Sequence, residues 1–268
     1  MSRQERRQML RKMKKLANHL LANGLPGTNV SESTGAIAVL LKEKLCEEGN
    51  NNSASQAAEI IQKLFDTSIK KNPEEIQLAC EKNCSYCCHE YVTATAPEVF
   101  SIAQVLRQNG HQRSLEDIIG RTNKTVGLDE TSRTLNRTHC TLLRDSLCTV
   151  YYARPMACRR YVSSSLDSCV AKYRGEGDRV LMPKLHTKFS SICLIALYGA
   201  LASCLLPNCA YELSGALQVV LSEENSEARW LKGEDIFVHV HRDETLAPEM
   251  QKLVRILSNE LSELFGTH

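Results

Sequence analysis

Apolar residues recur at helical spacing along most of the chain. Near the start, Met9, Met13, Leu16 and Leu20 share one helical face, and Asn23-Gly24 predicts the end of that helix. The same reading predicts further helices over 31–45, 55–65, 95–109, 166–173, 190–206, 211–221 and 248–265, one helix within 112–138, and a short helix from Pro73 into Cys80. This pattern predicts an all-α fold.

Two segments depart from helical spacing. Residues 140–161 read as loop and short turns, since Pro155 interrupts them, and Phe237 to His241 shows the one strand-like alternation, which stands alone. There is no βαβ rhythm and no internal repeat. We therefore expect a single helical domain over 1–268, with an irregular cysteine-rich core at 76–170 and flanking helices at 1–72 and 176–268.

The composition is that of an ordinary soluble globular protein. Of 268 residues, 43% are hydrophobic and 24% charged, so a sizeable core can form without disulfides. The net charge of +2 provides no global field for nucleic acid or an anionic membrane. The apolar run from Ile192 to Leu206 is shorter than the roughly 20 residues of a spanning helix, which favours a buried core helix and no membrane.

The basic start of the chain bears on compartment and partners. Met1 to Lys15 carries seven Lys and Arg residues, but no apolar run of signal type follows. We expect a cytoplasmic protein, in whose reducing environment twelve cysteines indicate metal or redox chemistry rather than a disulfide framework. A solvated basic face is the default interpretation of this helix, with binding to an acidic protein or RNA as the alternative.

Cysteines are concentrated near the middle of the chain. Four lie within nine residues, at Cys80, Cys84, Cys87 and Cys88. Spacings of four and three bring side chains to one side of a helix or turn, so Cys88 must point elsewhere unless the backbone is irregular. Three more follow at Cys140, Cys148 and Cys158. Seven thiolates exceed the four that one zinc takes, so either two metals share them or a cluster takes four.

Basic residues and histidines accompany the cysteines. Arg154, Arg159 and Arg160 flank Cys158. A tetrathiolate centre carries about two negative charges, which Arg154 and Arg159 could neutralise while donating N–H groups to sulfur. His89 and His139 are expected beside the ligands or in solvent. His239 and His241 are expected at the surface, and the remaining cysteines are read as buried structural thiols, namely Cys46, Cys193, Cys204 and Cys209.

The spacing resembles the YkgJ-type cysteine-cluster family, which is described as zinc- or iron-chelating. Its C-x3-C-x2-C-C knot is matched at Cys80 to Cys88, its distant cysteine at Cys140, and its C-x-[IV]-Y-x-x-R-P-x-x-C-R block at Cys148 to Arg159. The resemblance covers about residues 76 to 170 and adds Cys169 as a weaker eighth position. It implies a zinc or iron–sulfur centre without a settled reaction. The predicted metal ligands are Cys80, Cys84, Cys87, Cys88, Cys140, Cys148, Cys158 and Cys169.

An enzymatic alternative remains open. The three-cysteine signature of radical S-adenosylmethionine enzymes is also matched, by Cys80, Cys84 and Cys87, with Tyr86 directly before Cys87. That class uses a (β/α) barrel, for which the chain shows no alternation. The cysteine pattern of flagellin lysine methylase is similar too, which keeps an iron–sulfur-dependent methyl transfer as the second hypothesis. No nucleophile–base pair, phosphate loop or dinucleotide fingerprint identifies a substrate.

Overall fold

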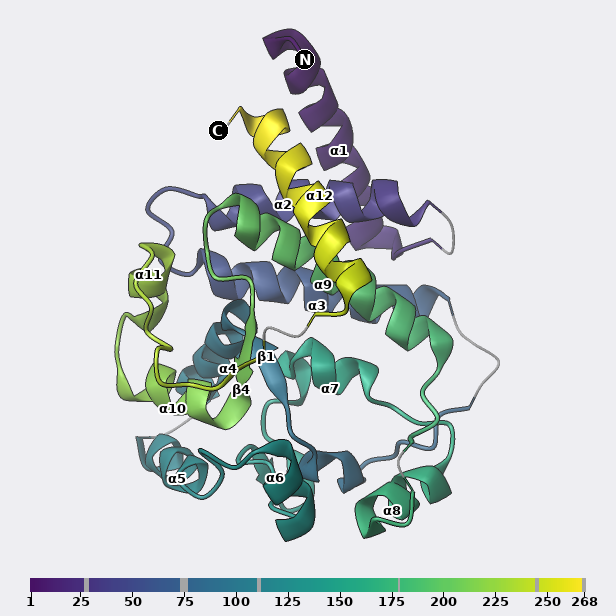
Figure 1. The fold of residues 1–268 in the computed structure, drawn as a ribbon, viewed down its shortest axis with the longest axis vertical. Coiled ribbons are helices and arrows are strands. Elements are labelled where there is room, and N and C mark those ends of the chain that lie inside the picture. Colours follow the sequence, from purple (N-terminus) through teal and green to yellow (C-terminus); the bar gives the residue numbers. More distant parts are fainter. Residues whose placement is uncertain (27–28, 73–76, 110–111, 178, 244–245, 267–268) are drawn as a thin grey trace.

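Helices form most of the fold, which confirms the predicted all-α class (Figure 1). The computed structural model describes residues 1–26, 29–72, 77–109, 112–177, 179–243 and 246–266. The α-helices are α1 (Arg3–Asn23), α2 (Val30–Leu45), α3 (Ser53–Lys71), α4 (Ala96–Asn109), α5 (Gln112–Thr122), α6 (Glu130–Asn136), α7 (Met156–Arg160), α8 (Leu166–Arg174), α9 (Lys184–Ser203), α10 (Leu213–Ser222), α11 (Ser226–Leu231) and α12 (Pro248–Phe265). The helix expected from Pro73 into Cys80 lies partly outside the described residues, and its described part, residues 77–80, is not helical.

Several details differ from the sequence-based expectation. The polar stretch 112–138 forms two helices, α5 and α6, rather than one. The short helix α11 was not predicted, because its six residues are too few to show a helical period.

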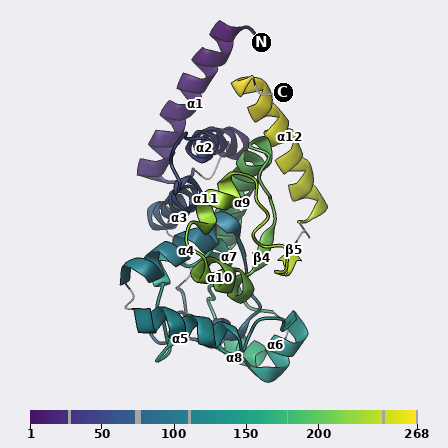
Figure 2. The same ribbon diagram turned by 90° about the vertical axis from the view of Figure 1, so that its left-hand side faces the viewer.

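A stack of helices occupies one half of the molecule. α9 packs against α2, α3 and α12, and α1 packs across α2 and α3. Figure 2 shows α1 and α12 on opposite sides of this stack, with both chain ends at the same end of the molecule. By its length and composition alone, α9 could cross a membrane, but 61% of its most apolar window is buried inside the fold. Its burial agrees with the predicted core helix.

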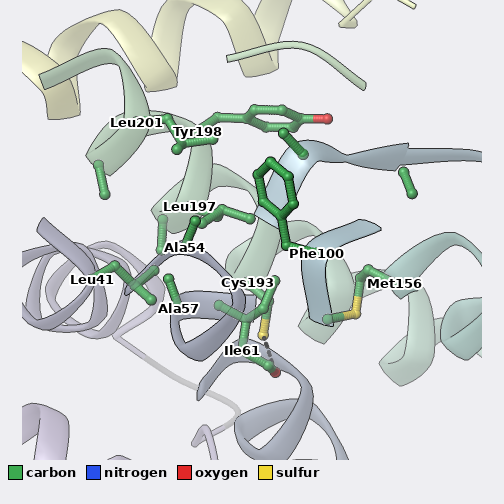
Figure 3. Packing of buried hydrophobic residues seen from close by; sticks show 14 of the residues in the cluster. Leu41, Ala54, Ala57, Ile61, Phe100, Met156, Cys193, Leu197, Tyr198 and Leu201 are labelled. Atoms are coloured by element: carbon green, nitrogen blue, oxygen red, sulfur yellow. Dashed lines mark hydrogen bonds between the residues drawn. The ribbon is translucent and has the colours of Figure 1, made fainter. Parts of the chain in front are cut away.

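The apolar core joins this stack to the cysteine-rich half. Figure 3 shows Phe100 of α4 between Leu197 of α9 and Met156 of α7. Met156 is fully buried, so it anchors α7, the helix that carries Cys158, to the core. Cys193 is also fully buried, and its thiol donates a 3.7 Å hydrogen bond to the carbonyl oxygen of Ile61. Cys193 is therefore the structural thiol that the sequence predicted.

A small antiparallel sheet lies beside α4. Its strands are β1 (Thr93–Thr95), β4 (Ala210–Glu212) and β5 (Arg242–Asp243), in the order β1-β4-β5. The strand expected at Phe237 to His241 is wrong. The Val240 N–H donates to the Phe237 carbonyl at 2.9 Å, which closes a turn. This turn buries Phe237 and leaves the neighbouring Val238 60% exposed.

The basic face of α1 is partly paired within the molecule. Lys12 lies 3.1 Å from Glu32, and Lys14 lies close to Glu43, both on α2. These exposed ion pairs contribute little to stability individually. They pair two of the positive charges that an acidic partner could contact. Binding of a protein through this helix stays a prediction.

Gly24 is required where the chain leaves α1 and crosses α3. Its φ of 80° and ψ of 173° fall in a region that is essentially restricted to glycine, and an added Cβ would lie 2.8 Å from the Cα of Ser68. We expect Gly24→Ala to lower the free energy of unfolding by about 2–4 kcal/mol in urea denaturation. Gly175 has a φ of 77° but no atom within 4 Å of an added Cβ, so Gly175→Ala should cost only about 1 kcal/mol. Equal losses would contradict the close-approach explanation.

Glu227 links α11 to the start of α3 and should make folding pH-dependent. Its carboxylate accepts hydrogen bonds from the Ser55 N–H at 2.7 Å and the Ser55 hydroxyl at 3.0 Å. Burial outweighs these donors and raises the pKa of Glu227 from 4.5 to about 7. Between these values the folded chain holds a proton that the unfolded chain has released, so stability falls as the pH rises through this window.

The matched variant Glu227→Gln should remove this slope. Its stability relative to the original protein should increase by about 3 kcal/mol between about pH 4 and pH 8, because the amide keeps one acceptor and never ionises. Urea unfolding of both proteins across this range measures the difference directly. A difference that does not change with pH would show that Glu227 titrates at its ordinary pKa.

Candidate metal centre

The backbone of the cysteine knot is irregular. Asn83 has a φ of 71°, in the left-handed region that Asn tolerates, and the Cys84 N–H closes a turn onto the Glu81 carbonyl at 3.1 Å. The 3₁₀ helix η1 (Tyr86–His89) follows directly. This backbone allows the neighbouring thiols of Cys87 and Cys88 to hydrogen-bond to each other. The sequence analysis required an irregular backbone for Cys88 to face the other cysteines of the knot, and the structure has one.

The Cys87–Cys88 contact creates an asymmetric pair of thiols. The hydrogen bond from Cys88 favours a thiolate at Cys87 and lowers the pKa of Cys87 to about 7. The same contact, together with burial, raises the pKa of Cys88. Cys87 is therefore the readier thiolate of this pair near neutral pH.

A hairpin brings two distant cysteines to the knot. The Cys140 N–H donates to the Cys88 carbonyl at 2.7 Å. Strands β2 (Leu143–Arg144) and β3 (Leu147–Cys148) follow, joined through Asp145 and Ser146, which both have positive φ as a tight hairpin turn requires. The Leu143 N–H donates to the Cys140 carbonyl at 3.0 Å, and Leu143 pairs with Cys148 across the hairpin, so the hairpin returns the chain to Cys148 near Cys140.

A buried carboxylate positions Cys158. Glu98 of α4 accepts hydrogen bonds from the N–H of Thr95 at 2.9 Å and from the N–H of Met156 at 2.6 Å. It therefore fixes both the start of α4 and the first turn of α7. Cys158 lies in that turn, and its N–H donates to the Pro155 carbonyl at 2.9 Å.

Five cysteines from these segments form one electrostatic unit, which we term the inner group. Its members are Cys87, Cys88, Cys140, Cys148 and Cys158. Burial raises the pKa of Cys140, Cys148 and Cys158, and negative charge on neighbouring thiols raises it further. Arg154 lies near Cys87, Cys148 and Cys158, and its positive charge acts to lower the pKa of these three thiols.

Three further cysteines form an outer group beside the first. Cys80 interacts with Cys84, Cys169 and the shared Cys87. The Ser163 N–H donates to the Cys80 sulfur at 3.4 Å, and the Ala79 N–H donates to the Ser163 carbonyl at 2.8 Å. This backbone pairing ties the knot to the segment that leads into α8, on which Cys169 lies. All eight predicted positions are therefore linked, as two neighbouring groups.

The cysteines open onto a cavity of about 1880 Å³. Seven of the eight predicted ligands line it: Cys80, Cys84, Cys87, Cys88, Cys140, Cys148 and Cys158. The thiols do not form a closed ligand set as they stand. In the part of the chain that the structure describes, no three Cys, His, Asp or Glu side chains are arranged to hold one ion together.

The two arginines expected beside the metal differ in their surroundings. Arg154 lies among the inner-group thiols, with its guanidinium 4.1 Å from the centre of the Tyr151 ring. Arg159 is buried, and its nitrogens donate to Asp66 and to the carbonyl oxygens of Tyr152 and Arg154. Arg159 therefore stabilises the loop that carries Arg154, and its contacts do not support the expected donation to sulfur.

The histidines lie at the margin of the site. His89 is buried against His139 and Tyr173, with ring centres 4.2 Å and 4.8 Å away. Its ring Nε2 is buried without a partner among the described residues. His239 and His241 are exposed, as expected, and line the rim of the cavity, where His241 lies 2.9 Å from the Tyr91 hydroxyl.

Sequence reasoning missed several cavity residues. Glu90 lies 3.7 Å from Lys172, and burial raises the pKa of its carboxyl. Tyr161 lies near Cys87 and Cys169, and burial raises the pKa of its hydroxyl. Both residues line the cavity. Glu90 follows the knot by two positions, but nothing in the spacing marks Tyr161 or Lys172.

The fold and this site define a helical cysteine-cluster protein. Residues 79–182 match the family model described as "CxxCxxCC: Putative zinc- or iron-chelating domain", the family of the YkgJ-type cysteine-cluster proteins. The match begins close to the predicted start and extends past residue 170 to include all of α8. No curated protein and no solved structure matches the chain. The S-adenosylmethionine alternative gains no support from these comparisons.

Proposed function

We propose that this protein chelates zinc or iron through the thiolates of the inner group. The observation that carries the proposal is the convergence of Cys87, Cys88, Cys140, Cys148 and Cys158, with Arg154 near three of them. These cysteines come from three separate segments of the chain. All five line the cavity, although Cys140 and Cys148 also pack against the apolar core.

The electrostatics of the inner group fit a cation. Burial opposes ionisation of Cys140, Cys148 and Cys158, whereas a bound divalent ion would favour their thiolates strongly. A centre with four thiolates carries about two negative charges, and Arg154 is placed to offset part of that charge. The ion would supply structural cross-linking between the knot, the hairpin and α7.

The outer group extends the proposal to a second ion. Cys80, Cys84 and Cys169 lie next to Cys87, which can belong to either group. Eight cysteines are too many for a single tetrahedral zinc. Two ions that share Cys87, or one cluster with spare thiols, would account for them. Both require a reducing compartment, which supports a cytoplasmic location.

Metal analysis after anaerobic purification tests the proposal. Stoichiometric zinc in a colourless protein would identify a zinc module, and iron with broad visible absorption would identify an iron–sulfur centre. Cys148→Ser should lower the metal content or affinity by at least about tenfold, because it removes an inner-group ligand. Cys193→Ser, at a buried thiol outside the site, should leave the metal content unchanged.

The outer group can be tested separately. Cys169→Ser should reduce the stoichiometry only if a second ion is bound. Protein that contains no metal after anaerobic purification and reconstitution with zinc or iron would contradict chelation. A Cys148→Ser variant with full metal affinity would exclude Cys148 from the ligand set.

A further inference from the structure

A second pair of cysteines lies away from the metal centre. The sulfur atoms of Cys46 and Cys204 are 2.8 Å apart, although 158 positions separate the two residues in sequence. Each residue directly follows a long helix, since Cys46 ends α2 and Cys204 ends α9. Figure 1 shows both helices ending on the same side of the stack. Neither thiol lines the cysteine cavity.

The surroundings of this pair differ from those of a structural thiol. Cys46 is exposed and Cys204 half-buried, so the sequence-based reading of Cys46 as buried is wrong. The hydrogen bond from Cys204 lowers the pKa of Cys46 to about 7, and the nearby Lys42 ammonium acts in the same direction. Cys193, by contrast, is fully buried, and burial raises its pKa.

Lys42 is fixed at this junction. Its ammonium donates to the Ser203 carbonyl at 3.1 Å and lies 5.0 Å from the centre of the Phe265 ring of α12. The positive charge is therefore held beside both helix ends. An exposed thiol of low pKa with a second thiol in contact combines the features of a redox-active dithiol, namely an attacking thiolate and a resolving partner.

We propose that Cys46 and Cys204 form a reversible disulfide by exchange with a low-molecular-weight disulfide such as oxidised glutathione. The Cys46 thiolate attacks one sulfur of the small disulfide, which forms a mixed disulfide and releases one small thiolate. That thiolate takes the Cys204 proton. The Cys204 thiolate then attacks the Cys46 sulfur, which releases the second small thiolate, and this thiolate takes up the proton that Cys46 released to water when it ionised. The protein loses two electrons and two protons, and the small disulfide is reduced to two thiols.

The disulfide would join the ends of α2 and α9 across a long loop of chain. Such a cross-link restricts the unfolded state strongly. We expect the melting temperature of the oxidised protein to rise by roughly 5–10 °C and to return after reduction with dithiothreitol. The dithiol is thus a redox-responsive cross-link between two helices of the stack, independent of the metal centre.

Titration of the purified, metal-containing full chain with oxidised glutathione tests the proposal. Intact mass should show the loss of two hydrogen atoms, and peptide mapping should find Cys46 joined to Cys204. Cys204→Ser should stop at the mixed disulfide on Cys46. Cys46→Ser should form no disulfide at this position, and Cys193→Ser should behave as the original protein does.

Three results would overturn the proposal. One is oxidation of the cavity cysteines while Cys46 and Cys204 remain thiols. Another is stable glutathionylation of Cys46 in the original protein without transfer to Cys204. The third is a mapped Cys46–Cys204 disulfide that leaves the melting temperature unchanged, since the disulfide would then not stabilise the helical stack.

Discussion

Removal of the bound ion with a strong chelator is expected to lower the melting temperature of the protein by at least about 10 °C. The reason lies in the segments that carry the inner group. Between residues 77 and 92 the only regular structure among the described residues is η1, and between 139 and 155 it consists of the hairpin and the 3₁₀ helix η2 (Tyr151–Ala153). Few apolar side chains of these segments are buried, among them Leu142 and Val150. If the inner group binds an ion as proposed, its ligation would therefore provide much of the folding free energy of these segments.

The helical stack offers an internal reference for this experiment. α2, α3 and α9 supply a continuous buried core, so they should stay protected from proteolysis after chelation while cuts appear at 77–92 and 139–155. Adding the metal back should restore both the melting temperature and the protection. An apo protein that melts at the original temperature would show that no ion stabilises these segments, and would count directly against chelation by the inner group.

The helices could be predicted because each carries its own signal. α1 has an apolar face and ends at Gly24, and α9 is a continuous apolar run that the stack buries. The strands could not be predicted in this way. β4 pairs with β1 and β5 from distant parts of the chain, and strands of two or three residues are too short to show alternation.

The candidate site could likewise be predicted only where the signal is local in the sequence. The spacing of Cys80, Cys84 and Cys87 is local information, and the family resemblance extends it to Cys158. The separation into inner and outer groups depends on η1, the hairpin turn at Asp145 and the Glu98 carboxylate, all of which act through tertiary contacts. The proximity of Cys46 to Cys204 likewise follows from how α2 packs on α9, which no local pattern records.

The neighbouring residues Arg159 and Arg160 are expected to differ sharply when each is replaced by alanine. Arg159 is 2% exposed, whereas Arg160 is exposed at the surface of the same helix. Arg159→Ala removes the partner of Asp66 and leaves the carbonyl oxygens of Tyr152 and Arg154 without their donor. We expect a loss of about 3–5 kcal/mol in the free energy of unfolding, measured in urea, against less than about 0.5 kcal/mol for Arg160→Ala.

A second measurement separates the effect on the fold from the effect on the site. Because Arg159 holds the loop that places Arg154 among the thiols, Arg159→Ala should also weaken metal affinity under conditions where the variant is folded. Arg159→Lys retains the charge near Asp66 but loses the planar fork that reaches both carbonyl oxygens, so it should fall between the two alanine variants in stability. If both alanine variants were equally stable and bound metal equally well, Arg159 would not organise the loop. The position of Arg154 would then need another explanation.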